Sequence, residues 1–355
     1  NAAKGNKVIL VRKETSPEDV GGMHAAAGIL TATGGKTSHA AVVARGWGKC
    51  CIVGCESLNI DYNKGQFSVG DVVVKAGENI TLNGTSGDVY VGQLKLKMPE
   101  LPDSYQKIMK WADEIKKIKV RTNADTPYDA KKAIELGAEG IGLCRTEHMF
   151  FDTEDRRSAI QEMIVANKVE DRIKALNKLL PFQREDFVGI FKEMNGKPVT
   201  IRLIDPPLHE FVPHDEPKQR ELAAKIGVKF ETVKQRVDQL HEANPMLGHR
   251  GCRLAITYPE ILDMQVRAII EAACKCKKDG IDVKPEIMVP LIIDYKEFRL
   301  IEDRIRKLAD EIIKQSGADV KYMVGTMIEV PRAALLADKI AERAEFFSFG
   351  TNDLT

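Results

Sequence analysis

A histidine follows a glycine turn within residues 31–46, TATGGKTSHAAVVARG. The Gly-Lys-Thr-Ser of this segment resembles the end of a phosphate-binding P-loop, G-x-x-x-x-G-K-[ST], in which glycines let the backbone approach phosphates closely. That pattern requires a glycine five positions before Gly35, and the sequence has Leu30 there. The P-loop interpretation therefore fails, and the segment instead predicts a turn that brings His39 to the start of a helix.

The residues around His39 suit the transfer of a phosphoryl group. Gly34 and Gly35 permit close backbone approach, while Thr37 and Ser38 can cap the helix and donate hydroxyl hydrogen bonds. Free N–H groups at a helix N-terminus favour an anion, and a neutral imidazole is a nucleophile near neutral pH. A lone histidine is more often structural, so the spacing by itself leaves phosphohistidine as a hypothesis beside that plainer interpretation.

A second group of charged and polar residues lies at or just after the C-terminal ends of segments that the sequence predicts as strands: Arg145, Arg202, Arg250, Glu329, Asn352 and Asp353. In a β/α barrel the carboxyl ends of all strands face one mouth, where the active site lies. Arginine offers forked donors for carboxylate and phosphate oxygens, and the carboxylates of Glu329 and Asp353 are hard ligands suited to Mg²⁺. We therefore expect an anionic substrate held by arginines and Mg²⁺.

The segments that would position these side chains alternate between strands and helices from about residue 118 onward. This rhythm indicates an α/β fold with a parallel sheet, and its length favours a (β/α)₈ barrel of the TIM type. We predict seven strands, within residues 119–125, 139–147, 198–205, 248–254, 286–292, 322–330 and 346–353. The eighth strand is expected beyond Thr355, so the barrel is predicted to be truncated before its last strand.

The chain before the barrel predicts a smaller α/β domain over residues 1–92, joined by a helical linker over 93–118 to the barrel of residues 119–355. Short β-rich segments separated by Gly, Asn and Asp turns fill this smaller domain. Helices are expected within residues 16–26 and 38–46, and strands within 7–12, 28–35 and 50–92.

With 53 basic and 52 acidic residues, the 355-residue chain has a net charge of +1 and no long basic stripe. Nucleic acid and membranes are therefore not expected as partners. The start of the chain lacks both an initiator Met and the apolar core of a signal peptide, and we interpret the sequence as the interior of a longer protein. Seven cysteines without metal-site spacing favour buried thiols in a reducing compartment, the cytoplasm or an organelle such as a plastid or glycosome.

Two motifs resemble the signatures of the phosphoenolpyruvate-utilising enzymes. GGKTSHAAVVAR is similar to their phosphohistidine signature, and FFSFGTNDLT is similar to their second signature. Further segments resemble the branch of this family that uses ATP, phosphate and pyruvate: GMHAAAGIL, ARGWGKCCIVGC, GIGLCRTEHMFF, IRLIDPPLHEFVP and NPMLGHRGCRL. The resemblance runs along essentially the whole chain.

The resemblance implies a swivelling phosphohistidine domain followed by a barrel that binds pyruvate or phosphoenolpyruvate. The implied activity is that of a phosphotransferase, which interconverts ATP, phosphate and pyruvate with AMP, diphosphate and phosphoenolpyruvate through a phosphohistidine at His39. The family's ATP-binding domain would precede residue 1. Mg²⁺ is the implied cofactor, and a homodimer formed through the barrel is expected.

Carried over motif by motif, the resemblance also implies roles for residues at the barrel mouth. Arg145 and Arg202 would bind the phosphoryl oxygens. Glu329 and Asp353 would hold Mg²⁺, which polarises the enolate oxygen as a Lewis acid. The substrate carboxylate would be lined by Gly350, Thr351 and Asn352.

Regulation at Thr37, two residues before His39, is implied as well, because the corresponding threonine is phosphorylated in plant members of the family. A dianionic group beside the nucleophile would repel the incoming phosphoryl group and occupy its N–H donors. The family's cysteine that protonates the enolate is expected beyond Thr355. Cys144 should not replace it, because strand alternation turns Cys144 away from the side that Arg145 faces.

Two alternative functions stay open. A phosphocarrier of the same family would pass phosphate from phosphoenolpyruvate to a small partner protein and would need neither ATP nor phosphate. A non-catalytic regulatory homologue would keep the fold without the reaction, although intact His39, Glu329 and Asp353 argue against it. The dependence of the full-length protein on ATP, phosphate and pyruvate separates all three.

Overall fold

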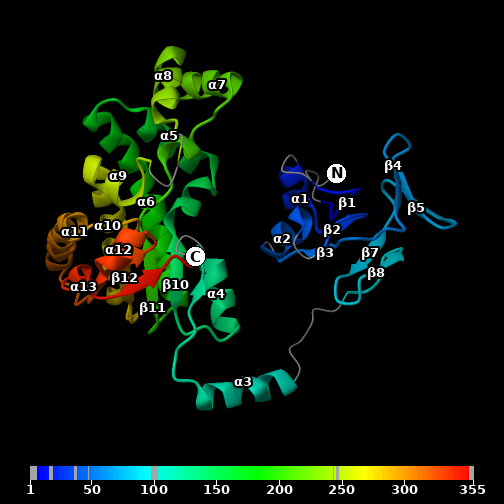
Figure 1. Cartoon of the computed structure of the whole chain (residues 1–355), viewed down its shortest axis with the longest axis horizontal. Helices are drawn as coiled ribbons and strands as arrows, with labels where there is room; N and C mark the ends of the chain where they lie inside the picture. The colour runs from blue at the N-terminus through cyan, green and yellow to red at the C-terminus, as the bar shows by residue number, and fades with distance from the viewer. Residues whose placement is uncertain are drawn as a thin grey trace. The chain divides into compact units, whose positions relative to one another are not determined.

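The computed structural model describes residues 6–15, 19–35, 38–46, 48–96, 103–242, 244 and 248–351 (Figure 1). The chain divides into two compact units, Asn1–Glu114 and Ile115–Thr355. Each unit has hydrophobic clusters of its own. The division lies within the segment that the sequence predicts as a linker.

A three-stranded parallel sheet forms the first part of the N-terminal unit. Its strands follow the chain order: β1 (Ile9–Arg12), β2 (Gly28–Thr31) and β3 (Cys50–Ile52). The intervening helices are α1 (Val20–Ala25) and α2 (His39–Gly46). Because β2 is central it is buried along its whole length, and its Ile29 packs with residues of both helices, Met23, Ala40 and Ala44. The predicted strands and helices of this part are thus confirmed within the described residues, and residues 16–18 lie outside them.

The rest of the N-terminal unit is antiparallel, apart from its last helix. One sheet has the order β4 (Asn59–Asp61), β5 (Gln66–Val69), β6 (Val72–Lys75), and a hairpin joins β7 (Ile80–Asn83) to β8 (Asp88–Val91). The hairpin turns where Oδ1 of Asn83 accepts the N–H of Thr85 at 3.1 Å, a side-chain turn typical of asparagine. α3 (Asp103–Ile115) follows, and none of its residues is buried.

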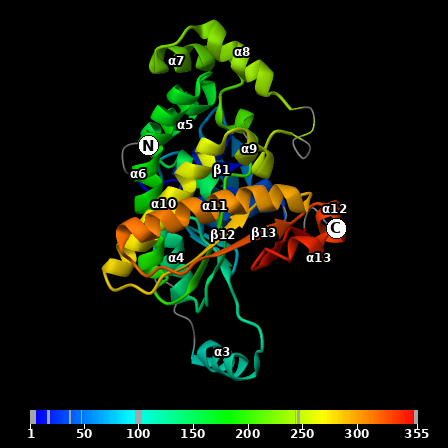
Figure 2. The same ribbon diagram turned by 90° about the vertical axis from the view of Figure 1, so that its left-hand side faces the viewer.

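One parallel sheet of six strands underlies the second unit. The spatial order follows the chain order: β9 (Thr122–Asn123), β10 (Ile141–Arg145), β11 (Pro198–Arg202), β12 (Lys284–Val289), β13 (Met323–Ile328) and β14 (Phe347–Phe349). Each neighbouring pair of strands is parallel. Parallel neighbours need a crossover connection, and helices provide it between these strands (Figures 1 and 2). This arrangement is a β/α half-barrel, and six of the seven predicted strands are confirmed.

The strand predicted within residues 248–254 is wrong, because this segment begins α9 (Gly251–Thr257). In the structure Arg250 precedes the helix and Gly251 has a left-handed φ of 56°, which ends the extended stretch. The buried residues that follow have helical spacing.

Helices and two short 3₁₀ segments, η3 and η4, connect the strands. β9 leads through α4 (Pro127–Glu135) to β10, and β10 leads to β11 through η3 (Thr146–Phe151), α5 (Glu154–Val165) and α6 (Val169–Glu193). The longest connection, from β11 to β12, contains η4 (Leu208–Phe211), α7 (Glu216–Ile226), α8 (Phe230–Leu240), α9 and α10 (Pro259–Lys278). The last connections are α11 (Tyr295–Ser316), then α12 (Pro331–Leu335) and α13 (Ala337–Ile340). α10 and α11 lie side by side (Figure 2).

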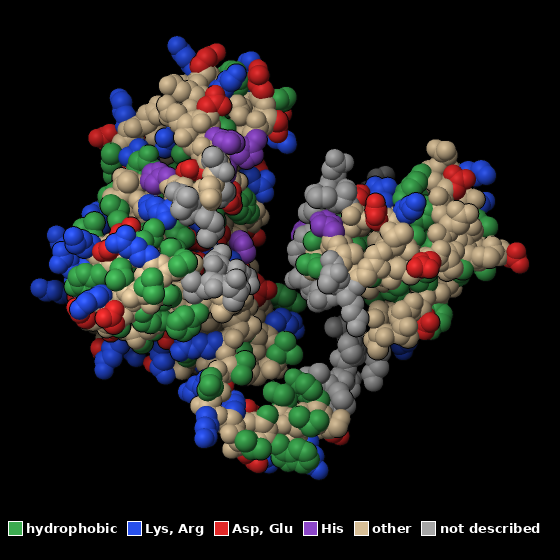
Figure 3. Space-filling model, in the orientation of Figure 1, with side chains coloured by type: hydrophobic (Ala, Val, Ile, Leu, Met, Phe, Trp, Pro, Cys, Tyr) green, Lys and Arg blue, Asp and Glu red, His purple; other side chains and the backbone are tan. Residues whose placement is uncertain are grey.

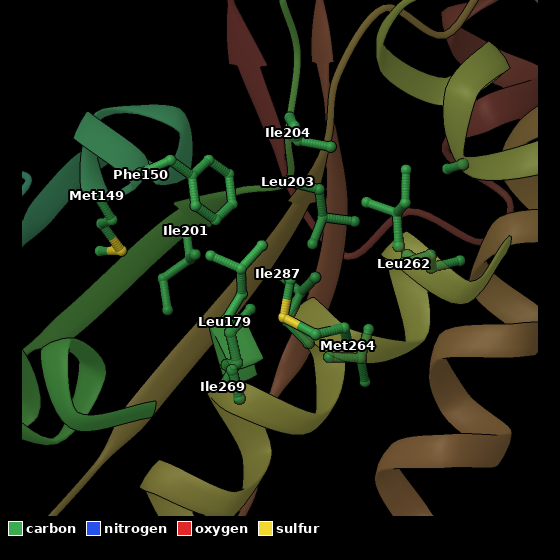
Figure 4. Close-up of a cluster of buried hydrophobic side chains, with 14 of the residues drawn as sticks. Met149, Phe150, Leu179, Ile201, Leu203, Ile204, Leu262, Met264, Ile269 and Ile287 are labelled. Carbon is green, nitrogen blue, oxygen red and sulfur yellow. The ribbon is translucent and has the colours of Figure 1, made fainter. Parts of the chain in front are cut away.

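The core of the second unit lies between the sheet and its covering helices. Figure 4 shows Leu179 of α6 and Ile269 of α10 in one cluster with Ile201 and Ile287 of the sheet. All four side chains are buried, and burial of such an aliphatic side chain contributes roughly 1.5–3 kcal/mol. This packing fixes the strands whose carboxyl ends carry the predicted site.

The surface agrees with the balanced composition. Basic and acidic side chains are interspersed over the face drawn in Figure 3. Among the described residues, no helix has the length and apolar character that crossing a bilayer requires.

Candidate functional site

His39 is the first residue of α2, as the sequence predicts. The preceding Ser38 caps the helix, because its Oγ accepts the N–H of Ala41 at 3.4 Å. Gly34 has a φ of 108°, and a Cβ there would come within 3.0 Å of the Ser38 side chain. The local sequence thus places the imidazole at the helix start. The predicted regulatory residue Thr37 lies outside the described residues.

Thr15 contacts the ring of His39. Its Oγ1 lies 3.2 Å from Nδ1 of His39, and the bond joins the loop after β1 to the start of α2. In the tautomer with the proton on Nδ1, the ring donates to the hydroxyl and Nε2 carries the lone pair that can attack phosphorus. The two residues are 24 positions apart, and no motif in the sequence pointed to Thr15.

Replacing Thr15 by valine is expected to slow phosphorylation of His39 in the full-length protein by about three- to tenfold. Valine keeps the shape but cannot accept the Nδ1 proton, and a net hydrogen bond contributes about 0.5–1.5 kcal/mol. Rapid-quench measurement of phosphohistidine formation tests this. Thr33→Val is the matched control, because the Thr33 hydroxyl donates to the carbonyl of Lys13 instead. Equal rates in both variants would contradict a role for Thr15 at the ring.

Arg145 and Arg202 end two adjacent strands of the second unit. They are register partners at the carboxyl ends of β10 and β11, so the structure brings these two predicted phosphoryl-binding residues together. The Arg202 side chain is 11% exposed and that of Arg145 is 33% exposed. Cys144, by contrast, is completely buried, and burial raises the pKa of its thiol well above the ordinary value.

Arg202 lies between two buried carboxylates. Its Nη2 is 2.5 Å from Oε1 of Glu147, and its Nη1 is 3.0 Å from Oδ2 of Asp205. Nη2 of Arg250 is 2.6 Å from the same Oδ2. Burial acts to lower the pKa of Arg202, but the carboxylates of Glu147, Asp205 and Glu329 outweigh it and raise that pKa. The network therefore keeps a fixed, charged fork of donors at the mouth of the half-barrel.

Arg250 reaches this mouth although its predicted strand is absent. The N–H of Gly251, at the start of α9, donates to the carbonyl of Asp205 at 3.1 Å. Nε of Arg250 donates to the same carbonyl at 3.2 Å. A helix start, and not a strand end, thus places Arg250 beside Arg202.

Three buried polar atoms of this network have no hydrogen-bond partner within the described part of the chain: Oε2 of Glu147, Nε of Arg202 and Oδ1 of Asp205. Each such atom costs about 1–3 kcal/mol if nothing completes it. Unpaired buried groups therefore mark places where a ligand or ordered water binds. The cluster offers both donors and acceptors to an anion with its waters.

Glu329 directly follows β13 and is 4% exposed. Its Oε1 accepts the N–H of Leu291 at 2.7 Å. It lies close enough to Arg202 to contribute to the raised pKa of that arginine. The structure therefore brings Glu329 to the same mouth as the arginines.

The segment after β14 begins beside Glu329. β13 and β14 are neighbours, and the N–H of Gly350 donates to the carbonyl of Ile328 at 2.9 Å. Thr351 follows and is exposed. Residues 352–355 lie outside the described residues, so the metal pairing of Glu329 with Asp353 and the role of Asn352 stay predictions. Within the described ranges, no three His, Cys, Asp or Glu side chains form a metal-binding group.

Asp125 connects Arg145 to His148. Its Oδ1 accepts the N–H of Arg145 at 2.7 Å, and its Oδ2 lies 2.7 Å from Nδ1 of His148 and 4.0 Å from Nη1 of Arg145. The bond to Asp125 raises the pKa of His148. When His148 is protonated, a second cation therefore stands beside Arg145.

Sequence reasoning missed one polar residue beside His39, Thr15, and four polar residues at the mouth of the half-barrel: Asp125, Glu147, His148 and Asp205. Three of them offered a signal, because Glu147, His148 and Asp205 stand within three positions after a strand-end arginine. Such positions are expected to hold the arginines in place.

Comparison with known proteins places the chain in a family. Residues 5–87 match the mobile domain of PEP-utilising enzymes, and residues 100–355 match the PEP-binding domain of the same enzymes. The chain belongs to the phosphoenolpyruvate-utilising enzyme family, with a mobile domain followed by a phosphoenolpyruvate-binding domain.

The chain is similar to pyruvate, phosphate dikinases. It is 55% identical to that of Clostridium symbiosum over 353 residues, which are 99% of this chain and 40% of the relative. It is 55% identical to that of Giardia intestinalis, over 100% of this chain and 40% of the relative. It is 57% identical to the chloroplastic pyruvate, phosphate dikinase 1 of Oryza sativa subsp. japonica, over 99% of this chain and 38% of the relative. The chain thus spans about two fifths of the length of these curated relatives.

Proposed function

We propose that the full-length protein interconverts ATP, phosphate and pyruvate with AMP, diphosphate and phosphoenolpyruvate through a phosphohistidine at His39. The observation that carries this proposal is the pair of sites in one chain: His39 at a capped helix start, and adjacent arginines at the mouth of a half-barrel. Similarity to pyruvate, phosphate dikinases along the whole chain supports this reaction over the others of the family.

In the first half of the reaction, Nε2 of His39 attacks the β-phosphorus of ATP; the bond from this phosphorus to the oxygen of AMP breaks and an N–P bond forms, so the β- and γ-phosphoryl groups move together to His39. Inorganic phosphate then attacks the γ-phosphorus and leaves as diphosphate, and the β-phosphoryl group stays on His39. The helix start provides N–H groups that stabilise the phosphoryl oxygens. The relatives extend beyond the matched region, and we assign the ATP-binding site to another part of the full-length protein.

In the second half, the N–P bond breaks and the enolate oxygen of pyruvate accepts the phosphoryl group. Arg145 and Arg202 bind the phosphoryl oxygens and offset charge as the bond changes. Glu147 and Asp205 fix Arg202 in place, since both carboxylates bond its guanidinium. Gly350, Thr351 and Asn352 line the substrate carboxylate.

The residues present fit Mg²⁺. Glu329 is a buried carboxylate at a strand end, and carboxylate oxygens are the ligands that Mg²⁺ prefers. Glu329 together with Asp353 would hold the ion. Bound there, Mg²⁺ supplies Lewis-acid polarisation of the enolate oxygen.

An assay of the full-length protein tests the proposal. We expect phosphoenolpyruvate to form from pyruvate only when both ATP and inorganic phosphate are present, with AMP and diphosphate as products. Transfer from phosphoenolpyruvate to a small protein without nucleotide would instead show a phosphocarrier. Absence of both reactions would show a non-catalytic homologue.

We also propose that phosphorylation of Thr37 switches the enzyme off, because a dianion beside His39 repels the incoming phosphoryl group. Thr37→Glu in the full-length protein is expected to lose most activity, whereas Thr37→Val keeps a neutral group and serves as the control. Undiminished turnover of Thr37→Glu would contradict this electrostatic account. A homodimer through the barrel and a reducing compartment stay predictions.

A further inference from the structure

Leu291 has a left-handed backbone, and we infer that Leu291 is a positioning residue for the Glu329 carboxylate. Among the residues that the structure describes, Leu291 is the one non-glycine residue with a positive φ, which is 62°. A side chain with a Cβ disfavours this conformation, which persists only where the surroundings impose it. Such sites concentrate near functional groups, and Leu291 lies two residues after β12, at the same edge of the sheet as Glu329.

The N–H of Leu291 is directed at the carboxylate. It donates to Oε1 of Glu329 at 2.7 Å, and Leu291 and Glu329 are 1% and 4% exposed. A hydrogen bond to a charged acceptor is strong, and it strengthens further where water is excluded. Because a rigid donor holds Oε1 of Glu329, the position of this carboxylate oxygen is set before any ligand binds.

Two neighbours at the start of α9 hold Leu291 in this conformation. Sγ of Cys252 donates to the carbonyl of Leu291 at 3.0 Å, and the N–H of Cys252 donates to the carbonyl of Pro290 at 3.2 Å. Burial raises the pKa of the Cys252 thiol to about 12, so the thiol keeps its proton and can donate it. A Cβ on Gly251 would lie 2.8 Å from Cβ of Leu291, so only glycine allows this approach.

The same helix start also holds the arginine network. Gly251 donates its N–H to the carbonyl of Asp205, whose side chain binds Arg202 and Arg250. The first turn of α9 therefore connects the phosphoryl-binding arginines with the carboxylate of Glu329. The inference rests on the proposed function, in which Glu329 holds Mg²⁺ and orientation of its carboxylate affects metal affinity.

Binding of Mn²⁺ alone to the full-length protein, followed by electron paramagnetic resonance, tests this role. Glu329→Gln identifies the site, because the part of the Mn²⁺ binding that this variant loses belongs to the site that contains Glu329. Cys252→Ala is expected to weaken Mn²⁺ binding at that site by roughly tenfold. Residues that orient a metal ligand without touching the metal change metal affinity by about 10- to 100-fold, and this expectation takes the lower value. Cys252→Ser is expected to restore it, because a hydroxyl can donate to the same carbonyl.

Cys276→Ala is the matched control for loss of a buried thiol. Sγ of Cys276 donates to the carbonyl of Val188 at 3.7 Å, away from the site, so this variant should lose thermal stability yet bind Mn²⁺ as the parent does. Parent-like Mn²⁺ affinity in Cys252→Ala, with Glu329→Gln still defective, would overturn the positioning role and leave the proposed function standing. If Glu329→Gln bound Mn²⁺ as the parent does, the metal site would be wrong and this inference with it.

Discussion

His39→Asn in the full-length protein incorporates no label from the β-phosphate of ATP. Asparagine fills similar space at the start of α2 but has no nucleophilic lone pair, so no N–P bond can form. Loss of a nucleophile reduces turnover by roughly 10⁴-fold or more, which brings the label to background. The measurement is acid-labile, base-stable radioactivity on the protein after incubation with β-labelled ATP and phosphate.

His24→Asn is the control for this prediction. His24 belongs to α1 of the same unit, and its backbone carbonyl accepts from Nζ of Lys49. This variant should be labelled like the parent, and both variants should show the parent's far-ultraviolet circular dichroism. Label retained by His39→Asn would mean that another residue carries the phosphoryl group.

Local chemistry explains why the turn at His39 could be predicted. Gly34 supplies the positive φ and Ser38 supplies the cap, and both effects depend on neighbours in the sequence. The bond from Thr15 depends instead on the pairing of β1 with β2, which brings distant loops together. That contact is tertiary, and sequence patterns carry little information about it.

In the second unit, too, some features could be predicted from the sequence and others could not. Alternating strands and helices gave the parallel sheet, because crossovers between parallel strands need helices. Residues 248–254 were wrongly predicted as a strand: Gly251 adopts a left-handed φ and a helix begins there, which no pattern in the sequence indicated. The positive φ of Leu291 could not be predicted either, since nothing in a leucine favours it and the start of α9 imposes it.

The residues that hold the arginines were missed for a related reason. An arginine at a strand end indicates an anion site, because its guanidinium is charged and offers forked donors to carboxylate and phosphate oxygens. Which carboxylate it bonds is decided by the fold: Glu147 comes from η3 and Asp205 from the loop after β11. Sequence gives the donors of such a network, and the structure is needed for its geometry.

Asp205→Asn tests that geometry and is expected to have a large effect. Oδ2 of Asp205 accepts from Arg202 at 3.0 Å and from Arg250 at 2.6 Å, with the Asp205 side chain 4% exposed. Asparagine keeps the shape but removes the charge, so two largely buried guanidinium groups lose the negative charge that they share. Breaking a buried ion pair by removing one partner costs about 3–5 kcal/mol. The midpoint of urea unfolding of the full-length protein should fall accordingly.

The effect on activity separates a positioning role from mere stability. Displacement of Arg202 by even 1 Å is expected to slow phosphoryl transfer from phosphoenolpyruvate to His39 by about 100-fold. Phosphorylation of His39 by ATP should stay normal, because Asp205 belongs to the other unit. Asp186→Asn removes the charge of another, partly buried arginine partner, since Oδ1 of Asp186 accepts from Nη2 of Arg156 at 2.9 Å. If both variants lose stability but Asp205→Asn alone loses the phosphoenolpyruvate reaction, Asp205 holds the arginines for catalysis. If both retain that reaction, the network at the mouth serves only the fold.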